Sequence, residues 1–346
     1  MATLEERLKA FVKLGDFLRS YKPGKKNLGR EYEELKAVLL QARLKNAWFT
    51  DDNLLYALSA WGELLSPDNL QAWTSSYSIP ENGGRKIAII MAGNIPLVGF
   101  HDLLSVLVSG HSAVVKMSSN DKVLLPFFMR KLIEYEPQLE GKVEFSEGIL
   151  KEYDAVIATG SDNTSRYFEY YFGHKPHIIR KNRNSVAVLQ GDETKEQLQA
   201  LGEDIFRYFG LGCRSVSKLF VPEEYDFKAF FEAIDSYLYL KDHHKYHNNY
   251  DYNKAVYLMS EFKFLDNDFL LLKQDEAYAS PIGTVFYETY SSKSALSEKL
   301  TAQAEKIQCV VAEGITAEEV AYGHTQKPSL TDYADGVDTV EFLLKT

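Results

Sequence analysis

The stretch KIAIIMAGNIPLVGFHDLLSVLVSGHSAVVKM, residues 86–117, decides the fold. It begins with residues 86–92, a short run that is apolar after Lys86 and of the kind that a buried parallel strand shows. Residues 93–96 (GNIP) then predict a turn, residues 98–110 a helix, and residues 113–117 a second buried strand. Strand, helix and strand in this order predict a βαβ unit with parallel strands.

The alternation continues along the chain. A helix is predicted for residues 124–136, a third strand for residues 154–159, and a further helix for residues 163–172. Two more strands are expected at residues 177–180 and 185–190. We therefore expect an α/β fold built on a parallel sheet.

Polar or glycine-containing turns follow three of these strands. They are Gly93-Asn94, Ser118-Ser119 and Gly160-Ser161. Ligands of open parallel sheets bind beyond the carboxyl ends of the strands, so these turns predict a nucleotide or cofactor crevice. A GxGxxG phosphate turn is absent: the most similar string, GLGCRS at residues 210–215, lacks the third glycine. A dinucleotide site of another design stays open.

A second feature is the tetrad Gly210-Leu211-Gly212-Cys213, between a helix-like run (196–209) and a strand-like run (217–222). A cysteine in such a tight junction can expose its sulfur and leave its backbone N–H free, as a thiolate that attacks a carbonyl requires. The alternative is a buried free cysteine that packs as a small hydrophobe. Cys309 opens the apolar run 309–313 and is interpreted as structural.

The whole-chain totals narrow the class of protein. With 346 residues, the chain exceeds the roughly 250–300 residues of one core, so two domains are expected. Its net charge of −10 argues against a nucleic-acid partner. Two cysteines, no signal-peptide core and no apolar run long enough to span a membrane are typical of a cytoplasmic protein.

These pieces, in this order, resemble the aldehyde dehydrogenase superfamily and, more narrowly, the acyl-CoA reductases of the bioluminescence (LuxC) type. The resemblance rests on an Asn-x-Pro turn after the first strand (residues 94–96) and on Lys116, which ends a Val-rich strand. It rests further on a Thr-Gly-Ser turn (residues 159–161), the Gly-x-x-Cys loop (residues 210–213), and the tail QKPSLTDYADGVDT (residues 326–339).

The resemblance implies an aldehyde-dehydrogenase-like fold, with a Rossmann-like parallel-sheet cofactor domain, a second α/β catalytic domain and a helical N-terminus. We expect N-terminal helices packed on the cofactor domain, the cofactor domain, the catalytic cysteine domain and a tail that returns to the core or makes an oligomer contact. The expected ranges are 1–80, 81–209, 210–322 and 323–346.

The resemblance also implies roles for individual residues. Cys213 would be the nucleophile, and the Asn94 amide would share the oxyanion with the Cys213 backbone N–H. Lys116 would meet the adenosine ribose or its 2′-phosphate. The expected cofactor-binding residues are Lys116, Ser118, Ser119, Thr159, Gly160, Ser161 and Glu276.

One departure from the superfamily is informative. Hydrolytic members carry a glutamate in a segment that aligns with residues 180–184, which read RKNRN here. A water-activating base is needed to form a free acid but not to transfer an acyl group between thiols, so the departure favours thioester reduction. The cationic side chains of residues 180–184 could lie near a CoA site, or the segment could be a solvated basic turn.

The expected reaction is NADPH-dependent reduction of a fatty acyl thioester to the aldehyde, with CoA as the leaving group. NADPH is favoured because no acidic residue directly follows Lys116; NADH stays open because Asp121 lies close. The expected partners are a fatty acyl-CoA or acyl-protein substrate, an acyl-protein synthetase or transferase, and further copies in a homo-oligomer. The alternatives are a CoA-acylating aldehyde dehydrogenase working oxidatively with NAD, and a non-catalytic binding or assembly subunit.

The string His243-His244-x-x-His247 suggests a metal site at first sight. No further ligand pattern joins these histidines, and the chemistry needs no metal, so no metal is expected. A proton donor is the second interpretation, and a wet, partly packed loop is the favoured one.

Overall fold

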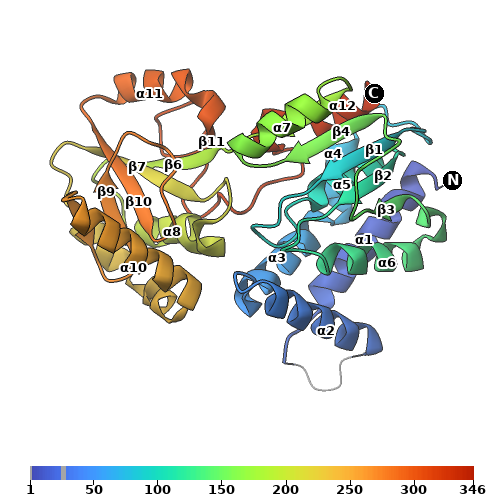
Figure 1. Cartoon of the computed structure of the whole chain (residues 1–346), viewed down its shortest axis with the longest axis horizontal. Helices are drawn as coiled ribbons and strands as arrows, with labels where there is room; N and C mark the ends of the chain where they lie inside the picture. Colours follow the sequence, from blue (N-terminus) through green and yellow to red (C-terminus); the bar gives the residue numbers. More distant parts are fainter. Residues whose placement is uncertain (1, 25–28) are drawn as a thin grey trace. The chain divides into compact units, whose positions relative to one another are not determined.

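The computed structural model describes residues 2–24 and 29–346, and the chain forms two compact units (Figure 1). The first unit comprises Met1–Lys181 and Ser329–Thr346, and the second comprises Asn182–Pro328. The predicted boundary after residue 209 therefore does not hold. Residues 182–209 belong to the second unit because the strand β6 (Asn184–Val188) pairs with strands of that unit's sheet.

The sheet of the first unit has five parallel strands in the order β3-β2-β1-β4-β5. The strands are β1 (Lys86–Ile90), β2 (Ser112–Lys116), β3 (Val143–Phe145), β4 (Ala155–Thr159) and β5 (His177–Arg180). This is the order of a doubly wound, Rossmann-like sheet, and it reverses between β1 and β4. The predicted α/β class is confirmed.

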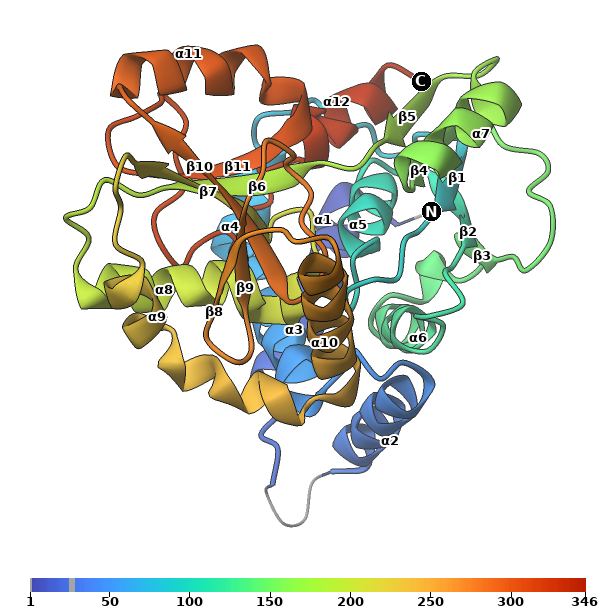
Figure 2. The ribbon, with the colours of Figure 1, turned by 60° about the vertical axis from the view of Figure 1, so that its left-hand side comes forward.

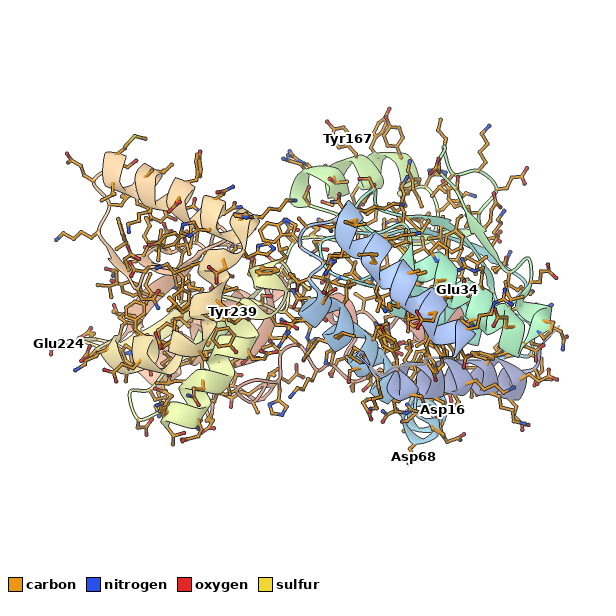
Figure 3. All side chains as sticks on the ribbon, turned by 90° about the horizontal axis from the view of Figure 1, so that it is seen from below. Asp16, Glu34, Asp68, Tyr167, Glu224 and Tyr239 are labelled. Carbon is orange, nitrogen blue, oxygen red and sulfur yellow. The ribbon has the colours of Figure 1, made fainter. Side chains whose placement is uncertain are left out.

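Helices cover both faces of this sheet. They are α1 (Leu4–Ser20), α2 (Arg30–Lys45), α3 (Asp51–Leu64), α4 (Pro67–Thr74), α5 (Phe100–Val108), α6 (Leu124–Tyr135), α7 (Asp162–Phe172) and α12 (Thr339–Leu344). Ile87 and Val115 share one core with α1, α5 and α6. Ala88 and Val156 face Phe168 of α7 on the other side. On the outer side of α7, Tyr167 is exposed and points away from the sheet (Figure 3).

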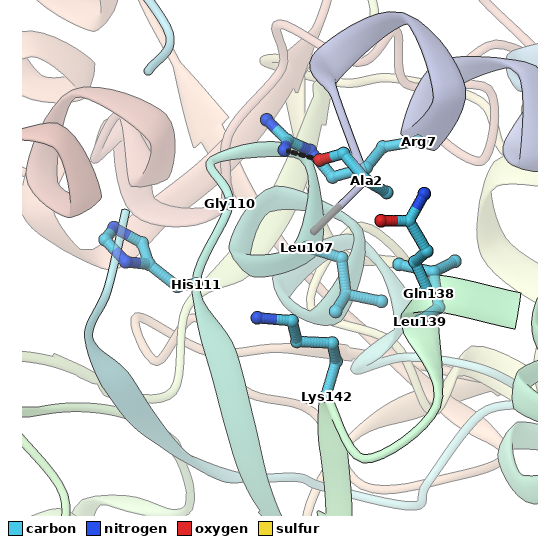
Figure 4. A pocket seen from close by; sticks show the side chains of 8 residues that line it. All are labelled: Ala2, Arg7, Leu107, Gly110, His111, Gln138, Leu139 and Lys142. Atoms are coloured by element: carbon cyan, nitrogen blue, oxygen red, sulfur yellow. Dashed lines mark hydrogen bonds between the residues drawn. The ribbon is translucent and has the colours of Figure 1, made fainter. Parts of the chain in front are cut away.

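Arg7 of α1 anchors the N-terminal helix. Its guanidinium is buried and donates hydrogen bonds to the carbonyl oxygens of Ala2 at 2.7 Å, Glu81 at 2.6 Å and Val108 at 3.1 Å. It lines a small pocket beside α5, together with Lys142 and the residues drawn in Figure 4. Each bond satisfies a backbone carbonyl, and the bonds to Ala2 and Val108 are buried, so the arginine joins α1 to the rest of the unit.

The second unit has a six-stranded sheet in the order β11-β6-β7-β10-β9-β8. Besides β6, its strands are β7 (Val216–Pro222), β8 (Phe264–Asp266), β9 (Leu271–Gln274), β10 (Thr284–Tyr290) and β11 (Ile307–Val311). All pairs are parallel except β8 with β9. Within this unit, α11 (Lys293–Ala302) lies on one side of the sheet, and α8 (Lys195–Phe206), α9 (Lys228–Ala233) and α10 (His244–Met259) lie on the other (Figures 1 and 2).

The C-terminal residues return to the first unit. Leu330, Val340 and Leu343 belong to its largest core. Trp73 Nε1 donates to the Tyr333 hydroxyl at 2.6 Å, and Tyr333 shares a 2.8 Å hydrogen bond with the Tyr77 hydroxyl. The tail is therefore part of the folded first unit. Within residues 2–24 and 29–346, no helix has the length and apolar character needed to cross a membrane.

Candidate active site

The predicted cofactor turns leave one edge of the first sheet. Ile90 of β1 lies opposite Lys116 of β2 and Ala158 of β4, so the turns that follow these three strands emerge together. Gly93 packs so closely that a Cβ atom there would come within 2.5 Å of the Ser118 Cβ. The structure thus brings together the turns after β1, β2 and β4 at the point where the strand order reverses.

The turn that holds Asn94 is fastened by Asp121. The Leu97 backbone N–H donates to Asp121 Oδ2 at 3.1 Å, and the Asp121 N–H donates to the Ser118 carbonyl at 3.2 Å. Leu97 has a φ of +59°, a left-handed conformation that a branched side chain adopts only under constraint. Burial raises the pKa of the Asp121 carboxyl to about 6. Asn94 itself is partly buried.

Lys116 and its serine neighbours offer polar groups at this edge. The Lys116 side chain is exposed, although the strand that it ends is buried. Ser118 is partly buried and its hydroxyl accepts a hydrogen bond from the Asn120 N–H at 3.3 Å, whereas Ser119 is exposed. A cation and hydroxyls at the carboxyl edge suit a ribose or phosphate.

The Thr159-Gly160-Ser161 turn leads directly into α7. Ser161 caps the helix, because its hydroxyl accepts a hydrogen bond from the Thr164 N–H at 3.3 Å. A Cβ atom at Gly160 would approach Thr164 Cβ to 3.0 Å and a Phe168 ring carbon to 2.9 Å. Only a glycine fits there without displacing the helix, so the turn holds a helix N-terminus against the sheet edge. Such an end favours anions.

Cys213 is exposed, in a short turn that precedes β7. The turn follows three residues with left-handed backbone: Tyr208 (φ +55°), Phe209 (φ +59°) and Gly210 (φ +75°). The Ser185 hydroxyl of β6 donates to the Cys213 carbonyl at 3.0 Å. Consecutive non-glycine residues in this conformation are strained, and such strain gathers at functional sites.

A buried hydrogen-bond network connects this turn to α8 through segment 322–326. Asp204 of α8 accepts hydrogen bonds from the Gly323 N–H at 2.6 Å and from the Thr325 N–H at 2.9 Å. Next to these residues, the Gln326 amide donates to the Ser215 hydroxyl at 3.3 Å. Segment 322–326 is thereby bound to both α8 and the cysteine turn. Burial raises the pKa of Asp204, and the donated hydrogen bonds oppose the shift.

The histidine string belongs to α10, so the favoured interpretation as a wet loop is wrong. His243 caps this helix, with its Nδ1 accepting the Tyr246 N–H at 3.2 Å, and its ring stacks on Phe209 with centroids 4.1 Å apart. His247 forms a pair with Asp251 at 3.4 Å. Within the residues described, no group of three or more metal-ligating side chains occurs.

Glu276 lies in the loop after β9, with its side chain exposed. Its carbonyl accepts a hydrogen bond at 2.8 Å from the ammonium group of Lys218, a fully buried residue of β7. The same ammonium group pairs with Glu288 at 2.7 Å and lies 4.9 Å from the centre of the Tyr278 ring. Burial lowers the pKa of Lys218, and Glu288 opposes that shift. Lys218 therefore joins β7, the strand that follows the Cys213 turn, to the Glu276 loop.

Arg180 is neither a solvated cation nor a side chain available to CoA. It is buried and makes a two-pronged ion pair with Asp102, with N–O distances of 2.6 and 2.8 Å. It also donates to the Thr339 hydroxyl at 3.1 Å. Arg183 lies 3.5 Å from the carbonyl oxygens of Ala304 and Ile307. These contacts assign Arg180 a structural role. Cys309, in β11, is buried.

The profile of the family described as acyl-CoA reductase (LuxC) matches residues 25–301. The protein belongs to this family. The match spans both the strand-end turns of the first unit and the Cys213 turn of the second. The resemblance inferred from the sequence is thereby confirmed, and with it an oxidoreductase family that acts on acyl and aldehyde groups.

Solved structures of aldehyde dehydrogenases share the fold of this acyl-CoA reductase family member. The indole-3-acetaldehyde dehydrogenase of P. syringae superposes with a TM-score of 0.65 at 14% identity, over 90% of this chain and 76% of that one. For aldehyde dehydrogenase 21 of Physcomitrella patens the TM-score is 0.66 at 13% identity, over 99% and 84%. An E. coli NADP-dependent enzyme gives a TM-score of 0.61 at 13% identity, over 91% and 74%. No curated protein sequence matches.

Two supporting residues were missed by the sequence reasoning. Lys218 interrupts the apolar run SKLFVP, and a lysine inside a buried strand is a signal that it has a specific partner. Asp204 falls on the buried face of α8, a position that its helical spacing could have revealed. In both cases the partner lies far along the chain, so the sequence signals burial without naming what is bound.

Proposed function

We propose that this protein reduces a fatty acyl thioester, acyl-CoA or acyl-protein, to the aldehyde with NADPH, through an acyl group carried on Cys213. The observation that supports this most directly is the exposed Cys213 in its strained turn, within a chain that belongs to the acyl-CoA reductase family. A cysteine of this kind has the access and the neighbouring backbone donors that a nucleophile needs.

In this proposal the Cys213 thiolate adds to the thioester carbonyl. The carbon–sulfur bond to CoA then breaks, CoA leaves as a thiol after taking up a proton, and the acyl group stays on Cys213. The Cys213 N–H and the Asn94 amide would stabilise the oxyanion; loss of one such donor typically costs about 10²–10³ in rate. A bound reduced nicotinamide would supply the hydride that converts the acyl-cysteine carbonyl to the aldehyde level. Departure of the aldehyde restores the thiolate.

The residues at the edge of the first sheet fit a dinucleotide. Gly93 packs against Ser118, and Gly160 packs against Thr164 and Phe168, so both glycines hold their turns close to the neighbouring segments where the strand order reverses. Lys116 and Ser119 are exposed there, and α7 begins at the Ser161 cap. Lys116 and Ser118 would hold the adenosine ribose with its 2′-phosphate, residues 159–161 the phosphates, and Glu276 the nicotinamide ribose.

The composition of segment 180–184 supports the proposed direction of the reaction. Segment 180–184 carries no carboxylate, and its Arg180 forms a buried ion pair with Asp102. Without a carboxylate in this segment to activate water, we expect the acyl-cysteine to persist until hydride or a thiol reaches it. This supports reduction, with CoA as the leaving group, over oxidation to a free acid.

The direct test incubates the protein with palmitoyl-CoA, octanoyl-CoA or acetyl-CoA and NADPH. Absorbance loss, the aldehyde and free CoA are followed together and should agree one to one. Cys213→Ala should remove all activity and the acyl mass on the protein, whereas Cys309→Ala, the matched control at the buried cysteine, should keep both. Turnover that survives Cys213→Ala, or no turnover of any acyl thioester, whether acyl-CoA or acyl-protein, would disprove the proposal.

A further inference from the structure

Helix α10 of the second unit carries apolar side chains on two opposite sides. Its inner side packs on the second sheet (Figure 2), and the buried residues of this side are Tyr246, Tyr250, Asn253 and Tyr257. Its outer side carries Tyr252, Leu258 and Met259, which are 68%, 61% and 80% exposed. A surface helix normally has a polar face opposite its buried apolar face. Apolar side chains gathered on one exposed helix face indicate a surface that a partner covers.

The outer side of α10 has the spacing of a helix-pairing seam. Four exposed residues follow one another at alternating intervals of four, three and four positions, and they are Asn248, Tyr252, Ala255 and Met259. This is the alternation of the a and d positions in a coiled coil. The buried Tyr250 and Tyr257 then fall at f positions, on the side of the helix farthest from the seam. One polar asparagine in such a seam is a known means of specifying register.

We propose that this seam binds the same seam of a second copy of the chain, with the two α10 helices antiparallel. In such a pair each a position meets a d position, so Tyr252 of one copy packs on Ala255 of the other. The arrangement has two-fold symmetry, so this contact forms twice, once on each side of the axis. A large ring against a methyl group fills the space between two helices, which supports this register.

The charges at the two ends of α10 favour the antiparallel arrangement. Asp242 precedes the helix, Lys263 follows it, and both are exposed. Neither makes an ion pair within the described part of the chain, whereas the neighbouring Lys241 is paired with Asp268 at 3.8 Å. An antiparallel pair places Asp242 of each copy near Lys263 of the other, and a parallel pair would instead bring like charges together.

An anionic membrane is a poorer match for this surface. Helices that lie on such membranes are rich in lysine and arginine along their polar side. The seam of α10 is bordered by acidic side chains as well as basic ones, among them Asp242 and Asp251, and the whole chain has a net charge of −10. A second copy, which brings its own Lys263 to each Asp242, answers both the apolar seam and the charges beside it.

The test is analytical ultracentrifugation of the full chain over a series of concentrations. One helix pair buries less than the about 1,600 Å² of a standard interface, so wild type should pass from monomer to dimer in the micromolar range. Met259→Glu puts a charge into the seam and should raise the dissociation constant at least about tenfold. Ile149→Glu, the matched control at a position 83% exposed after β3, should leave the dissociation constant unchanged. A chain that stays monomeric, or a dimer that Met259→Glu leaves intact, would overturn the proposal.

Charge reversal tests the antiparallel arrangement by itself. Asp242→Lys places two lysines together at each end of the pair, and Lys263→Asp places two aspartates there. Each variant should weaken the dimer about fivefold at low salt, and the double variant, which restores both pairs with reversed polarity, should regain the wild-type dissociation constant. A double variant that dimerises no better than the single ones would overturn the antiparallel pairing. The readout is mass in solution, so it does not depend on the proposed enzymatic activity.

Discussion

At the scale of single residues, the structure separates side chains that serve chemistry from those that serve folding. Lys116 and Cys213 are exposed, as the cation and the nucleophile of the proposed function would have to be. Arg180 looked equally suited to an anion, but its two-pronged pair with Asp102 is buried. Removing one partner of such a pair leaves an uncompensated buried charge, which typically lowers the free energy of unfolding by about 3–5 kcal/mol. Arg180 therefore has a structural role.

Asp121 provides a pH-dependent prediction at this scale. Burial raises its pKa to about 6, above the unfolded value of about 3.9, so the folded state binds the proton more tightly. That contribution to stability is complete below about pH 4 and is lost as the pH rises through about 6. Asp121→Asn cannot ionise, and its amide oxygen can still accept the Leu97 N–H.

Urea unfolding at a series of pH values checks this expectation. The free energy of unfolding of Asp121→Asn minus that of wild type should increase by about 2–3 kcal/mol between about pH 4 and pH 7. Other titrating groups cancel in the difference. Two curves that run parallel over this range would show that Asp121 is not buried as described.

At the scale of elements, each predicted turn owes its position to the strand that precedes it. The turns after β1, β2 and β4 lie at one edge because those strands are parallel and adjacent. The Cys213 turn depends instead on neighbours from distant segments. Ser185 of β6 holds its carbonyl, and Asp204 of α8 holds segment 322–326 against it. The left-handed backbone at Tyr208 and Phe209 has contacts of its own: the Leu211 N–H donates to the Tyr208 carbonyl at 3.1 Å, and the Phe209 ring stacks on His243.

Lys218 gives the prediction at the scale of elements. Lys218→Met keeps the length of the side chain but removes the donor to the Glu276 carbonyl and to Glu288. Because Glu276 is proposed to hold the nicotinamide ribose, the KM for NADPH should rise about tenfold while kcat at saturating NADPH changes less than threefold. Steady-state kinetics with varied NADPH would measure the two constants separately.

Lys273→Met is the matched control. Lys273 is also a buried lysine, on β9, packed over aromatic rings and paired with Asp275. In the contacts described, the Lys273 ammonium group donates to Asp275 and not to the Glu276 carbonyl. The KM of Lys273→Met for NADPH should therefore stay near the wild-type value. Equal increases in both variants would indicate general destabilisation of the sheet and would remove the positioning role of Lys218.

At the scale of the whole molecule, the chain builds its first unit from both ends. Residues 329–346 complete the core that residues 2–24 and 29–181 begin, and Tyr333 joins the tail to α4. A series of hydrogen bonds runs from the Trp73 N–H through the hydroxyls of Tyr333 and Tyr77 to Asp338. Asp338 Oδ2 accepts the last of these bonds from the Tyr77 hydroxyl at 2.6 Å. Burial raises the pKa of Tyr77 to about 12, so its hydroxyl remains a donor to Asp338 even at mildly alkaline pH.

Tyr333→Phe tests the tail at this scale. It removes the acceptor of the Trp73 N–H and leaves that donor unpaired, so the free energy of unfolding should fall by about 1–3 kcal/mol. Tyr170→Phe, at an exposed position of α7, should change it by less than about 0.5 kcal/mol. Chemical denaturation of both variants measures the difference. Equal stabilities would mean that the tail adds nothing through this network.

The amino-acid sequence alone determined the alternation of strands and helices, the turns at residues 93–96 and 159–161, the cysteine turn and the family. These features are local: hydrophobic periodicity, glycine and proline act over a few residues, and family motifs keep their order along the chain. Tertiary structure alone decided the unit boundary at residue 181, the pairing of Arg180 with Asp102, and the burial of Lys218 against the Glu276 loop. It also decided that the histidine string belongs to a helix capped by His243. The physical reason is that each of these depends on a partner far away in sequence, and a charge or a ring reveals its role only once that partner is in place.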